Sequence, residues 1–340
     1  MANLKFAVFG TGFWSQFQIP AWFEVGGVDL VALYNRTVSK AEVIAQRFNV
    51  PRVYGDPEEL LKNEQLDFID IITEVPFHAP LVYLAAKYKI PVICQKPMAP
   101  DYETAQKMVQ VCRDANVPYM IHENFRWQTP MRALKQAVDS GQIGTPFRAR
   151  IDFITGFPVF ANQPFLKTLE HLIITDLGSH MLDIARWLFG EANSLYCQTK
   201  RVQPDIAGED AATFILQMGG RTTVVANIAY AGSFVEREVF PQTLVFIEGD
   251  KGSIELAPDY WLRVTTKEGT FSRRVPPPRY AWADPAYDAP HASIVPCNAN
   301  LLNAIKTGQP AETSGEDNLK TMRLVYSSYE SAARNEVIKF

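Results

Sequence analysis

The sequence has few cysteines, little excess charge and no long hydrophobic run. Its four cysteines are far apart and show no paired spacing, which argues against a disulfide framework or a cysteine-based metal site and favours a reducing compartment. No run approaches a membrane span, and the apolar start of the chain is too short and too broken by glycine for a signal peptide. The net charge of -4 offers no basic footprint for nucleic acid. We therefore expect a cytoplasmic protein with no membrane or nucleic-acid partner.

The chain is long enough for about two domains, and its first third alternates strand and helix patterns. Continuous apolar runs are separated by helical segments. The runs are "LKFAVFG", "VDLVALYN", "LDFIDIIT", "IPVICQ" and "VPYMIHE". Continuous apolar strands that alternate with helices are typical of a parallel sheet covered on both faces. Residues 1–123 are therefore predicted to form a doubly wound α/β (Rossmann) domain that binds a dinucleotide.

After residue 123 the pattern changes to successive strands joined by short turns that contain Gly or Asp. These strands are "SLYCQTKRV", "AATFILQM", "RTTVVANIAY", "QTLVFIEG" and "GSIELA". Short turns of this kind indicate antiparallel pairing. We expect residues 124–340 to form an α+β substrate domain with an open, mainly antiparallel sheet, whose last helix, about 316–335, packs back on the body. We expect the open face of that sheet to be buried by association into a homodimer or homotetramer.

A glycine-rich turn, "VFGTGFWS", lies where the first strand passes into the first helix. Gly10 permits the tight turn, Gly12 lets the backbone approach a pyrophosphate, and Ser15 is small enough for the third position of the fingerprint. Together with Thr11, Phe13 and Trp14, these residues predict an NAD(P) site. The alternative is a plain tight turn.

The end of the second strand should select the cofactor. An acidic residue there would bind the ribose 2′-hydroxyl of NAD, but this chain has Asn35, Arg36 and Thr37. A guanidinium flanked by neutral hydrogen-bonding groups suits a 2′-phosphate, which favours NADP. The alternative is that Arg36 stacks on the adenine and that NAD is used.

Further polar residues follow the strand ends of the first domain. Ligands of doubly wound sheets bind beyond the carboxyl ends of the strands, where Gly10, Asn35, Thr73, Lys96 and Asn124 are placed. Gln95, at the end of "IPVICQ", is also expected to contact the cofactor. Pro97 restricts the conformation of Lys96, which we expect to project toward the nicotinamide. His78 is expected to line the cofactor side or to cap a helix.

In the second domain, "TDLGSHMLD" places Asp176 and His180 four residues apart, on one face of a predicted helix. A carboxylate one turn from an imidazole can orient it and stabilise its protonated form. The alternative is an ordinary polar pair in which Asp176 caps the helix. Asp183 is expected to be structural.

The motifs "GTGFWS", "CQKP" and "DLGSH", with "ENFRW" at 123–127, resemble the Gfo/Idh/MocA family of NAD(P)-dependent oxidoreductases over essentially the whole chain. The resemblance implies that His180 exchanges a proton with the substrate hydroxyl, that Asp176 orients His180, and that Lys96 holds the same oxygen. It implies hydride transfer between a carbinol carbon and the nicotinamide, with no metal.

One position departs from the family pattern. Gln95 stands where the family usually has Glu, so a negative charge beside Lys96 is missing. An opposite charge favours the ammonium form of lysine. We therefore expect Lys96 to become neutral more easily than in relatives that carry Glu.

For the substrate, Asn124 and Arg126 lie at the domain junction, and the segment "GFPVFANQPFLKTLEH" mixes aromatics with amides that suit a sugar. His171 is the leading candidate there. With Lys96, Asp176 and His180 they form the predicted substrate site, although packing or solvation would explain Arg126 and His171 equally well. The 156–171 and 275–290 loops are expected to determine which sugar is bound.

The leading hypothesis is a dehydrogenase that acts on a sugar, inositol or related polyol. "CQKPMAP" and "NFRWQTPMRA" resemble sugar-catabolic members that oxidise an aldose, such as the branched pentose apiose, to its lactone. One alternative is a glycoside hydrolase that keeps NAD bound and oxidises its substrate transiently. Another is a non-catalytic NAD(P)-binding sensor, against which the presence of Lys96, Asp176 and His180 together argues.

Overall fold

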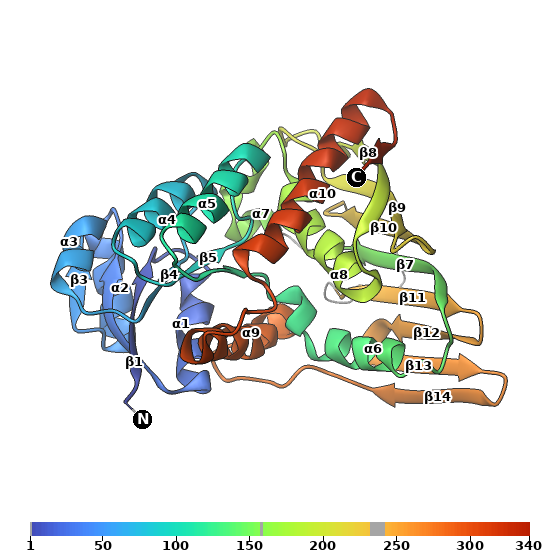
Figure 1. Ribbon diagram of the computed structural model, residues 1–340, viewed down its shortest axis with the longest axis horizontal. Helices are drawn as coiled ribbons and strands as arrows, with labels where there is room; N and C mark the ends of the chain where they lie inside the picture. Colours follow the sequence, from blue (N-terminus) through green and yellow to red (C-terminus); the bar gives the residue numbers. More distant parts are fainter. Residues whose placement is uncertain (1, 157–158, 232–241) are drawn as a thin grey trace. The chain divides into compact units, whose positions relative to one another are not determined.

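The computed structural model describes residues 2–156, 159–231 and 242–340 (Figure 1). The chain forms two compact units. The first contains Met1–Asn124, Ala281–Ala283 and Ile294–Met322, and the second contains Phe125–Tyr280, Asp284–Ser293 and Arg323–Phe340. The sequence predicted one boundary after residue 123, whereas the first unit also includes two later segments.

The later segments join the first unit because its last strand has polar partners in them. The backbone N–H of Ile121 donates to the Thr313 carbonyl at 2.8 Å, and the Thr313 hydroxyl donates to the Ile121 carbonyl at 2.7 Å. The His122 ring lies 3.0 Å from the Asn298 side-chain oxygen. These bonds satisfy polar groups along a strand edge, which no local sequence pattern reports.

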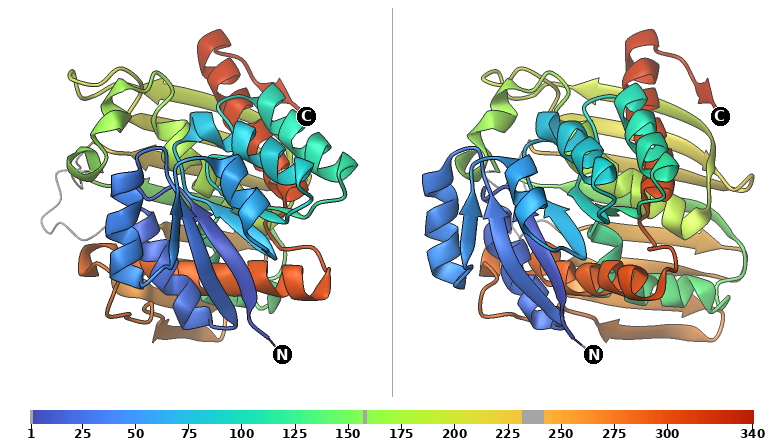
Figure 2. Two further views of the ribbon diagram at one scale, coloured as in Figure 1. Left: turned by 90° about the vertical axis from the view of Figure 1, so that its left-hand side faces the viewer. Right: turned by 60° about the vertical axis from the view of Figure 1, so that its left-hand side comes forward.

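The first unit contains a six-stranded parallel sheet in the order β3-β2-β1-β4-β5-β6. The strands are β1 (Leu4–Phe9), β2 (Val28–Tyr34), β3 (Arg52–Tyr54), β4 (Phe68–Ile71), β5 (Val92–Gln95) and β6 (Tyr119–His122). The helices between them are α1 (Ser15–Val25), α2 (Val38–Phe48), α3 (Pro57–Asn63), α4 (His78–Lys87) and α5 (Tyr102–Asp114). Figure 2 shows α4 and α5 side by side against this sheet. The predicted doubly wound fold is confirmed; only β3 and α3, which are short, were not predicted.

Side-chain caps explain where two of these helices begin. The Asp56 carboxylate accepts from the Glu59 N–H ahead of α3, and the Asp101 carboxylate accepts from the Thr104 N–H ahead of α5. Such side-chain caps satisfy helix N–H groups that lack an internal partner. The first helix tolerates Pro20 inside α1 without ending there.

The second unit contains a nine-stranded sheet in the order β14-β13-β12-β11-β7-β10-β9-β8-β15. Its strands are β7 (Pro146–Ile154), β8 (Ala192–Lys200), β9 (Ala211–Met218), β10 (Thr222–Ala229), β11 (Leu244–Gly249), β12 (Gly252–Ala257), β13 (Trp261–Thr266), β14 (Gly269–Arg274) and β15 (Ile338–Lys339). All neighbours pair antiparallel except β7 and β10, which are parallel. The predicted mainly antiparallel sheet is confirmed, but β7, β13, β14 and β15 were missed. In β14 every residue is exposed, so it carries no hydrophobic signal.

The remaining helices are α6 (Thr129–Asp139), α7 (Val159–Asn162), α8 (Ser179–Phe189), α9 (Asp288–Thr307) and α10 (Gly315–Arg334). In the part of the chain that the structure describes, no helix is both long enough and apolar enough to cross a bilayer.

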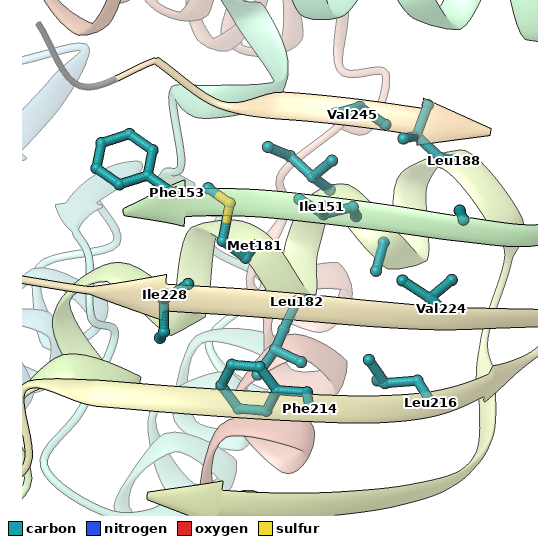
Figure 3. Packing of buried hydrophobic residues seen from close by; sticks show 14 of the residues in the cluster. Ile151, Phe153, Met181, Leu182, Leu188, Phe214, Leu216, Val224, Ile228 and Val245 are labelled. Atoms are coloured by element: carbon teal, nitrogen blue, oxygen red, sulfur yellow. The ribbon is translucent and has the colours of Figure 1, made fainter. Parts of the chain in front are cut away.

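The core of the second unit lies between the sheet and α8 (Figure 3). Ile151 of β7, Phe214 of β9 and Ile228 of β10 pack with Met181 and Leu182 of α8. Alternate residues of β9 point to opposite faces, so buried and exposed positions alternate along it. This packing fixes α8, which carries His180.

Neighbouring residues on β9 give a matched test of this core. Phe214 is 0% exposed and Ile215 is 46% exposed. We expect Phe214→Ala to lower the free energy of unfolding by about 3–5 kcal/mol, because it removes a buried ring and leaves a cavity. Ile215→Ala, on the opposite face, should change it by no more than about 1 kcal/mol. Urea unfolding measures both; equal losses would contradict the assigned faces.

Candidate active site

The glycine-rich turn has the geometry that a phosphate-binding turn needs. Gly10 has φ +106°, and a Cβ there would lie 2.6 Å from the Ile72 carbonyl oxygen, so only glycine fits. Apart from its two neighbours in the chain, no described residue has an atom within 4 Å of a Cβ added at Gly12, which leaves the backbone open to a ligand. Ser15 is fully buried and its hydroxyl donates to the Gly12 carbonyl at 2.7 Å.

Polar groups around this turn fit a dinucleotide. The Thr11 N–H donates to the Asn35 side-chain oxygen at 3.3 Å, and the Asn35 amide donates to the Thr37 carbonyl at 2.9 Å, which ties the turn to the end of β2. The Thr11 and Thr73 hydroxyl oxygens are buried and have no hydrogen-bond partner among the described residues. Buried hydroxyls without partners are unfavourable by about 1–3 kcal/mol, and a bound polar ligand would relieve this.

Arg36 is exposed beyond the end of β2. Its guanidinium carbon lies 5.0 Å from the centre of the Phe77 ring, a cation–π contact. The stacking alternative raised from the sequence therefore already has an aromatic partner within the protein.

His78 joins the ends of β4 and β5. The side chain is fully buried, its Nε2 lies 3.0 Å from the Thr73 carbonyl oxygen, and its Nδ1 lies 3.1 Å and 3.3 Å from the carbonyl oxygens of Pro97 and Met98. Burial lowers its pKa below the usual value for histidine. His78 thus holds the segment that follows Lys96; a direct contact with the cofactor stays a prediction.

A buried carboxylate is connected by hydrogen bonds to the end of β5. Asp70 of β4 is 0% exposed and accepts from the Gln18 amide at 2.9 Å and 2.7 Å and from the Trp22 indole at 2.7 Å. Burial raises the pKa of Asp70 to about 7. Gln95 donates its amide N–H to the Gln18 side-chain oxygen. Sequence reasoning missed this group, although an Asp flanked by two isoleucines in the apolar run "LDFIDIIT" was a usable signal.

In the second unit, Asp176 lies in a π-helical turn, Ile174–Gly178, that leads into α8. The Tyr230 hydroxyl donates to its carboxylate at 2.7 Å. Asp176 is therefore not the helix cap that the sequence allowed, because Gly178 occupies the position before α8. Burial and the neighbouring carboxylate raise the pKa of Tyr230 well above its usual range, so it remains a neutral donor. No sequence pattern pointed to Tyr230.

Two side chains hold the start of this turn. One Glu209 carboxylate oxygen accepts from the N–H groups of Leu172 at 3.1 Å and Ile174 at 3.3 Å, and from the Tyr329 hydroxyl at 2.8 Å. The Tyr329 hydroxyl in turn accepts from the Thr175 N–H at 3.3 Å. Turns of the π type often occur at functional sites, and this one is fixed by hydrogen bonds from distant segments.

His180 is held by an aromatic stack. It is 3% exposed, and its ring lies parallel to that of Phe125, with centroids 3.7 Å apart and an interplanar angle of 9°. The stack restricts rotation of the imidazole and so fixes the direction in which its nitrogens point. Phe125 belongs to the "ENFRW" segment, but its role in orienting His180 was not foreseen.

The other substrate candidates differ in environment. Arg126 is 4% exposed and forms a bidentate ion pair with the buried carboxylate of Asp183, at 2.7 Å and 2.6 Å. His171 is exposed and its ring packs 4.0 Å from that of Tyr329. Asn124 is 3% exposed. Substrate contacts by these three residues stay predictions.

The two predicted specificity loops are partly ordered into short helices. Within 156–171, the structure has α7 and a 3₁₀ turn, Pro164–Thr168, while residues 157–158 lie outside the described residues. Within 275–290 it has a 3₁₀ turn, Pro285–Tyr287. Among the described residues, no group of three or more His, Cys, Asp or Glu side chains is placed to hold a metal ion.

Comparison with known proteins identifies the class. Residues 4–123 match the family model for an oxidoreductase family with an NAD-binding Rossmann fold, and residues 131–255 match the Gfo/Idh/MocA C-terminal domain. The chain belongs to the Gfo/Idh/MocA family of oxidoreductases. The resemblance seen in the motifs, the fold class and the prediction of an NAD(P)-dependent oxidoreductase are confirmed.

Individual relatives cover nearly the whole chain. It is 42% identical to the D-apiose dehydrogenase of Paraburkholderia graminis, over 99% of this chain and 90% of that protein. It is 40% identical to the D-apiose dehydrogenase of Rhizobium rhizogenes, over 99% and 98%. A crystal structure of an oxidoreductase from Agrobacterium radiobacter in complex with NAD+, L-tartaric acid and magnesium is similar with a TM-score of 0.97 at 40% identity, covering 99% of this chain and 98% of that one.

The raised pKa of Asp70 predicts a pH dependence of stability. Because its folded pKa of about 7 exceeds the ordinary value of 3.8, its contribution is fully present below pH 4 and is lost as the pH rises to about 7. The stability of the wild type relative to Asp70→Asn should therefore fall by up to about 1.4 kcal/mol per pH unit between pH 5 and 7.

Urea unfolding at pH 5, 6, 7 and 8 measures this difference. Asp29→Asn, which alters an exposed carboxylate, serves as the control and should run parallel to the wild type. Parallel curves for Asp70→Asn as well would show that Asp70 titrates near its ordinary value in the folded protein.

Proposed function

We propose that this protein is a sugar dehydrogenase that oxidises the anomeric carbon of an aldose, with D-apiose the leading substrate, to the lactone. The observation that carries this proposal is the 42% identity to a D-apiose dehydrogenase over 99% of the chain. Support from the residues is that Lys96, Asp176 and His180 are all present. A 23% identical myo-inositol 2-dehydrogenase of Thermotoga maritima makes inositol the second substrate class to test.

Oxidation removes a hydride from the anomeric carbon and a proton from its hydroxyl. The bound nicotinamide supplies the hydride acceptor. We assign the proton to His180, whose ring is held by Phe125, and we assign to Lys96 a hydrogen bond to the same substrate oxygen. The anomeric C–H and O–H bonds break and a C=O bond forms, so that the lactone, the reduced nicotinamide and a protonated His180 result.

Asp176 acts on His180 by charge. A carboxylate favours the protonated imidazole that the reaction produces, and the hydrogen bond from Tyr230 fixes the carboxylate that supplies this charge. Asn124, Arg126 and His171 remain predicted substrate contacts. Arg126 would contribute one only with the part of its guanidinium not engaged by Asp183.

We place the cofactor at Gly10, Thr11, Gly12, Phe13 and Trp14, with Thr73 and His78 after β4, Gln95 at the last position of β5 and Lys96 directly after it. The open space at Gly12 supports this, as do the buried hydroxyls of Thr11 and Thr73, which have no hydrogen-bond partner in the part of the chain that the structure describes. We further propose that Asn35, Arg36 and Thr37 favour the 2′-phosphate of NADP. The four cysteines are buried thiols without disulfides, which supports a reducing compartment such as the cytoplasm.

The experiment described below also distinguishes two other functions. A redox glycoside hydrolase would cleave a glycoside with no net reduction of the cofactor. A sensor would bind NAD(P) without turnover, for which the acid–base residues would have no use. Association through the second sheet stays a prediction; Ile215 and Phe271, exposed by 46% and 66%, are apolar residues that such an interface would cover.

The first test is a spectrophotometric screen for cofactor reduction with aldoses, inositols and polyols. We expect reduction with D-apiose, and a loss of about 10²–10⁴-fold in kcat for His180→Ala, the range for removal of a general base. Met181→Leu, a change of similar volume in the core beside His180, should fold and retain activity. Cofactor binding without reduction by any sugar would contradict the proposal, and release of sugar from glycosides would then identify the hydrolase.

Cofactor choice is tested by comparing kcat/KM for NADP and NAD. We expect a higher value with NADP, and Arg36→Ala should lower it by about 10- to 100-fold, as loss of one charge-assisted hydrogen bond does, while NAD use changes little. Arg47→Ala is the matched control, since Arg47 is also exposed and lies 5.0 Å from a phenylalanine ring. Equal effects of Arg36→Ala on both cofactors would indicate stacking instead.

A further inference from the structure

A line of polar groups runs through the interior of the first unit from Lys96 to Asp70. The Lys96 N–H donates to the Gln95 side-chain oxygen at 3.2 Å, and the Gln95 amide donates to the Gln18 side-chain oxygen. The Gln18 amide donates to the Asp70 carboxylate. Gln18 and Asp70 are 0% exposed and Gln95 is 7% exposed, so water cannot readily replace a lost partner.

The bonds all point the same way, and Asp70 sets that direction. An ionised carboxylate only accepts hydrogen bonds, so Gln18 must present its NH₂ group to it and its oxygen to Gln95. Gln95 must then present its own NH₂ group to Gln18, which leaves its oxygen for the Lys96 N–H. Each amide has one donor end and one acceptor end. The orientation that Gln18 takes at Asp70 therefore determines the orientation of Gln95.

We propose that Asp70 is a positioning residue for Lys96, acting through the oriented side chains of Gln18 and Gln95. The proposal rests on the proposed role of Lys96 in binding the substrate oxygen. It also gives Gln95 a reason to differ from the Glu of related motifs. The negative charge next to Lys96 is absent, and a carboxylate two side chains further along fixes the segment instead.

Neutralising Asp70 should disturb the line as far as Lys96. In Asp70→Asn, the new NH₂ group faces a donor in either orientation, since Gln18 donates to both carboxylate oxygens and Trp22 to one of them. Turning Gln18 over only moves the conflict to Gln95, and turning Gln95 as well places its NH₂ group against the Lys96 N–H. The mismatch is thus relieved only at the expense of the bond to Lys96.

A negative charge at position 95 should also disturb the line of hydrogen bonds. In Gln95→Glu, two carboxylates compete for the single NH₂ group of Gln18. The double variant Asp70→Asn/Gln95→Glu satisfies every group with the line reversed. The carboxylate introduced at position 95 accepts from the Lys96 N–H and from the turned Gln18. The Gln18 oxygen accepts from the amide introduced at position 70, and the oxygen of that amide accepts from Trp22. The two single changes should therefore be harmful and their combination should be restored.

The test measures two quantities on the full-length protein at pH 9, above the pKa of about 7 of Asp70. The first is kcat/KM for the sugar found in the screen. The second is hydrogen exchange of the Lys96 backbone amide, read at single-residue resolution by mass spectrometry, which needs no turnover. Trp22→Phe is the control, because it removes a donor to Asp70 but leaves the line to Lys96 intact.

We expect each single variant to change both quantities by about tenfold, lowering kcat/KM and speeding exchange of the Lys96 amide. The double variant should return both to within about threefold of the wild type, because strongly coupled neighbours are not additive. Trp22→Phe should lower stability while leaving both quantities near those of the wild type. If Asp70→Asn fails to fold, the comparison of Gln95→Glu with the double variant decides.

The proposal is overturned if Asp70→Asn changes neither quantity, or if the double variant is no better than the worse single variant. A wild type with no activity toward any sugar would instead remove the proposed function. The exchange rates would still test the line of hydrogen bonds in that case, so the two failures can be told apart.

Discussion

Burial of a parallel sheet on both faces is the constraint on which the first unit depends. Strands such as β4 and β5 are buried along their whole length, so polar residues that serve a ligand must lie beyond the strand ends. Thr11, Thr73 and Lys96 all meet that condition. Asp70 breaks the rule by lying within a strand, and the structure accommodates it by surrounding it with donors from α1. A carboxylate at position 70 therefore requires hydrogen-bond donors such as Gln18 and Trp22 on the neighbouring helix.

In the second unit, the two proposed acid–base residues are positioned by side-chain contacts. Asp176 and His180 lie on an irregular turn and the helix that follows it, and neither would be well placed by backbone hydrogen bonding alone. Glu209 and Tyr329 hold the backbone of the turn, Tyr230 holds the carboxylate, and Phe125 holds the ring. These supporting groups come from segments far apart in the chain, so the proposed acid–base pair depends on the completed fold of this unit.

Sequence patterns predicted the sheet classes and the main motif residues, because hydrophobic periodicity and glycine requirements are local. The parallel strands, the glycine turn and the last helix, α10, were all readable in this way. The supporting contacts were not, since nothing local links Tyr230 to Asp176 or Gln18 to Asp70, which are 54 and 52 residues apart. The strand β14 was missed because an exposed edge strand lacks a hydrophobic period. The neighbouring β13 does alternate, with Leu262 and Val264 buried, so its pattern was overlooked rather than absent. The return of residues 294–322 to the first unit depends on tertiary bonds at β6.

The environment of the four cysteines has a practical consequence. All four thiols are buried, and burial raises the pKa of Cys94, Cys112 and Cys197 above the ordinary value, which suppresses the reactive thiolate. A thiol-directed dye should therefore leave the native side chains unmodified while the protein is folded. One cysteine introduced on an exposed strand such as β14 would then carry a single fluorophore, so that cofactor or sugar binding could be followed by optical titration without first removing any native residue.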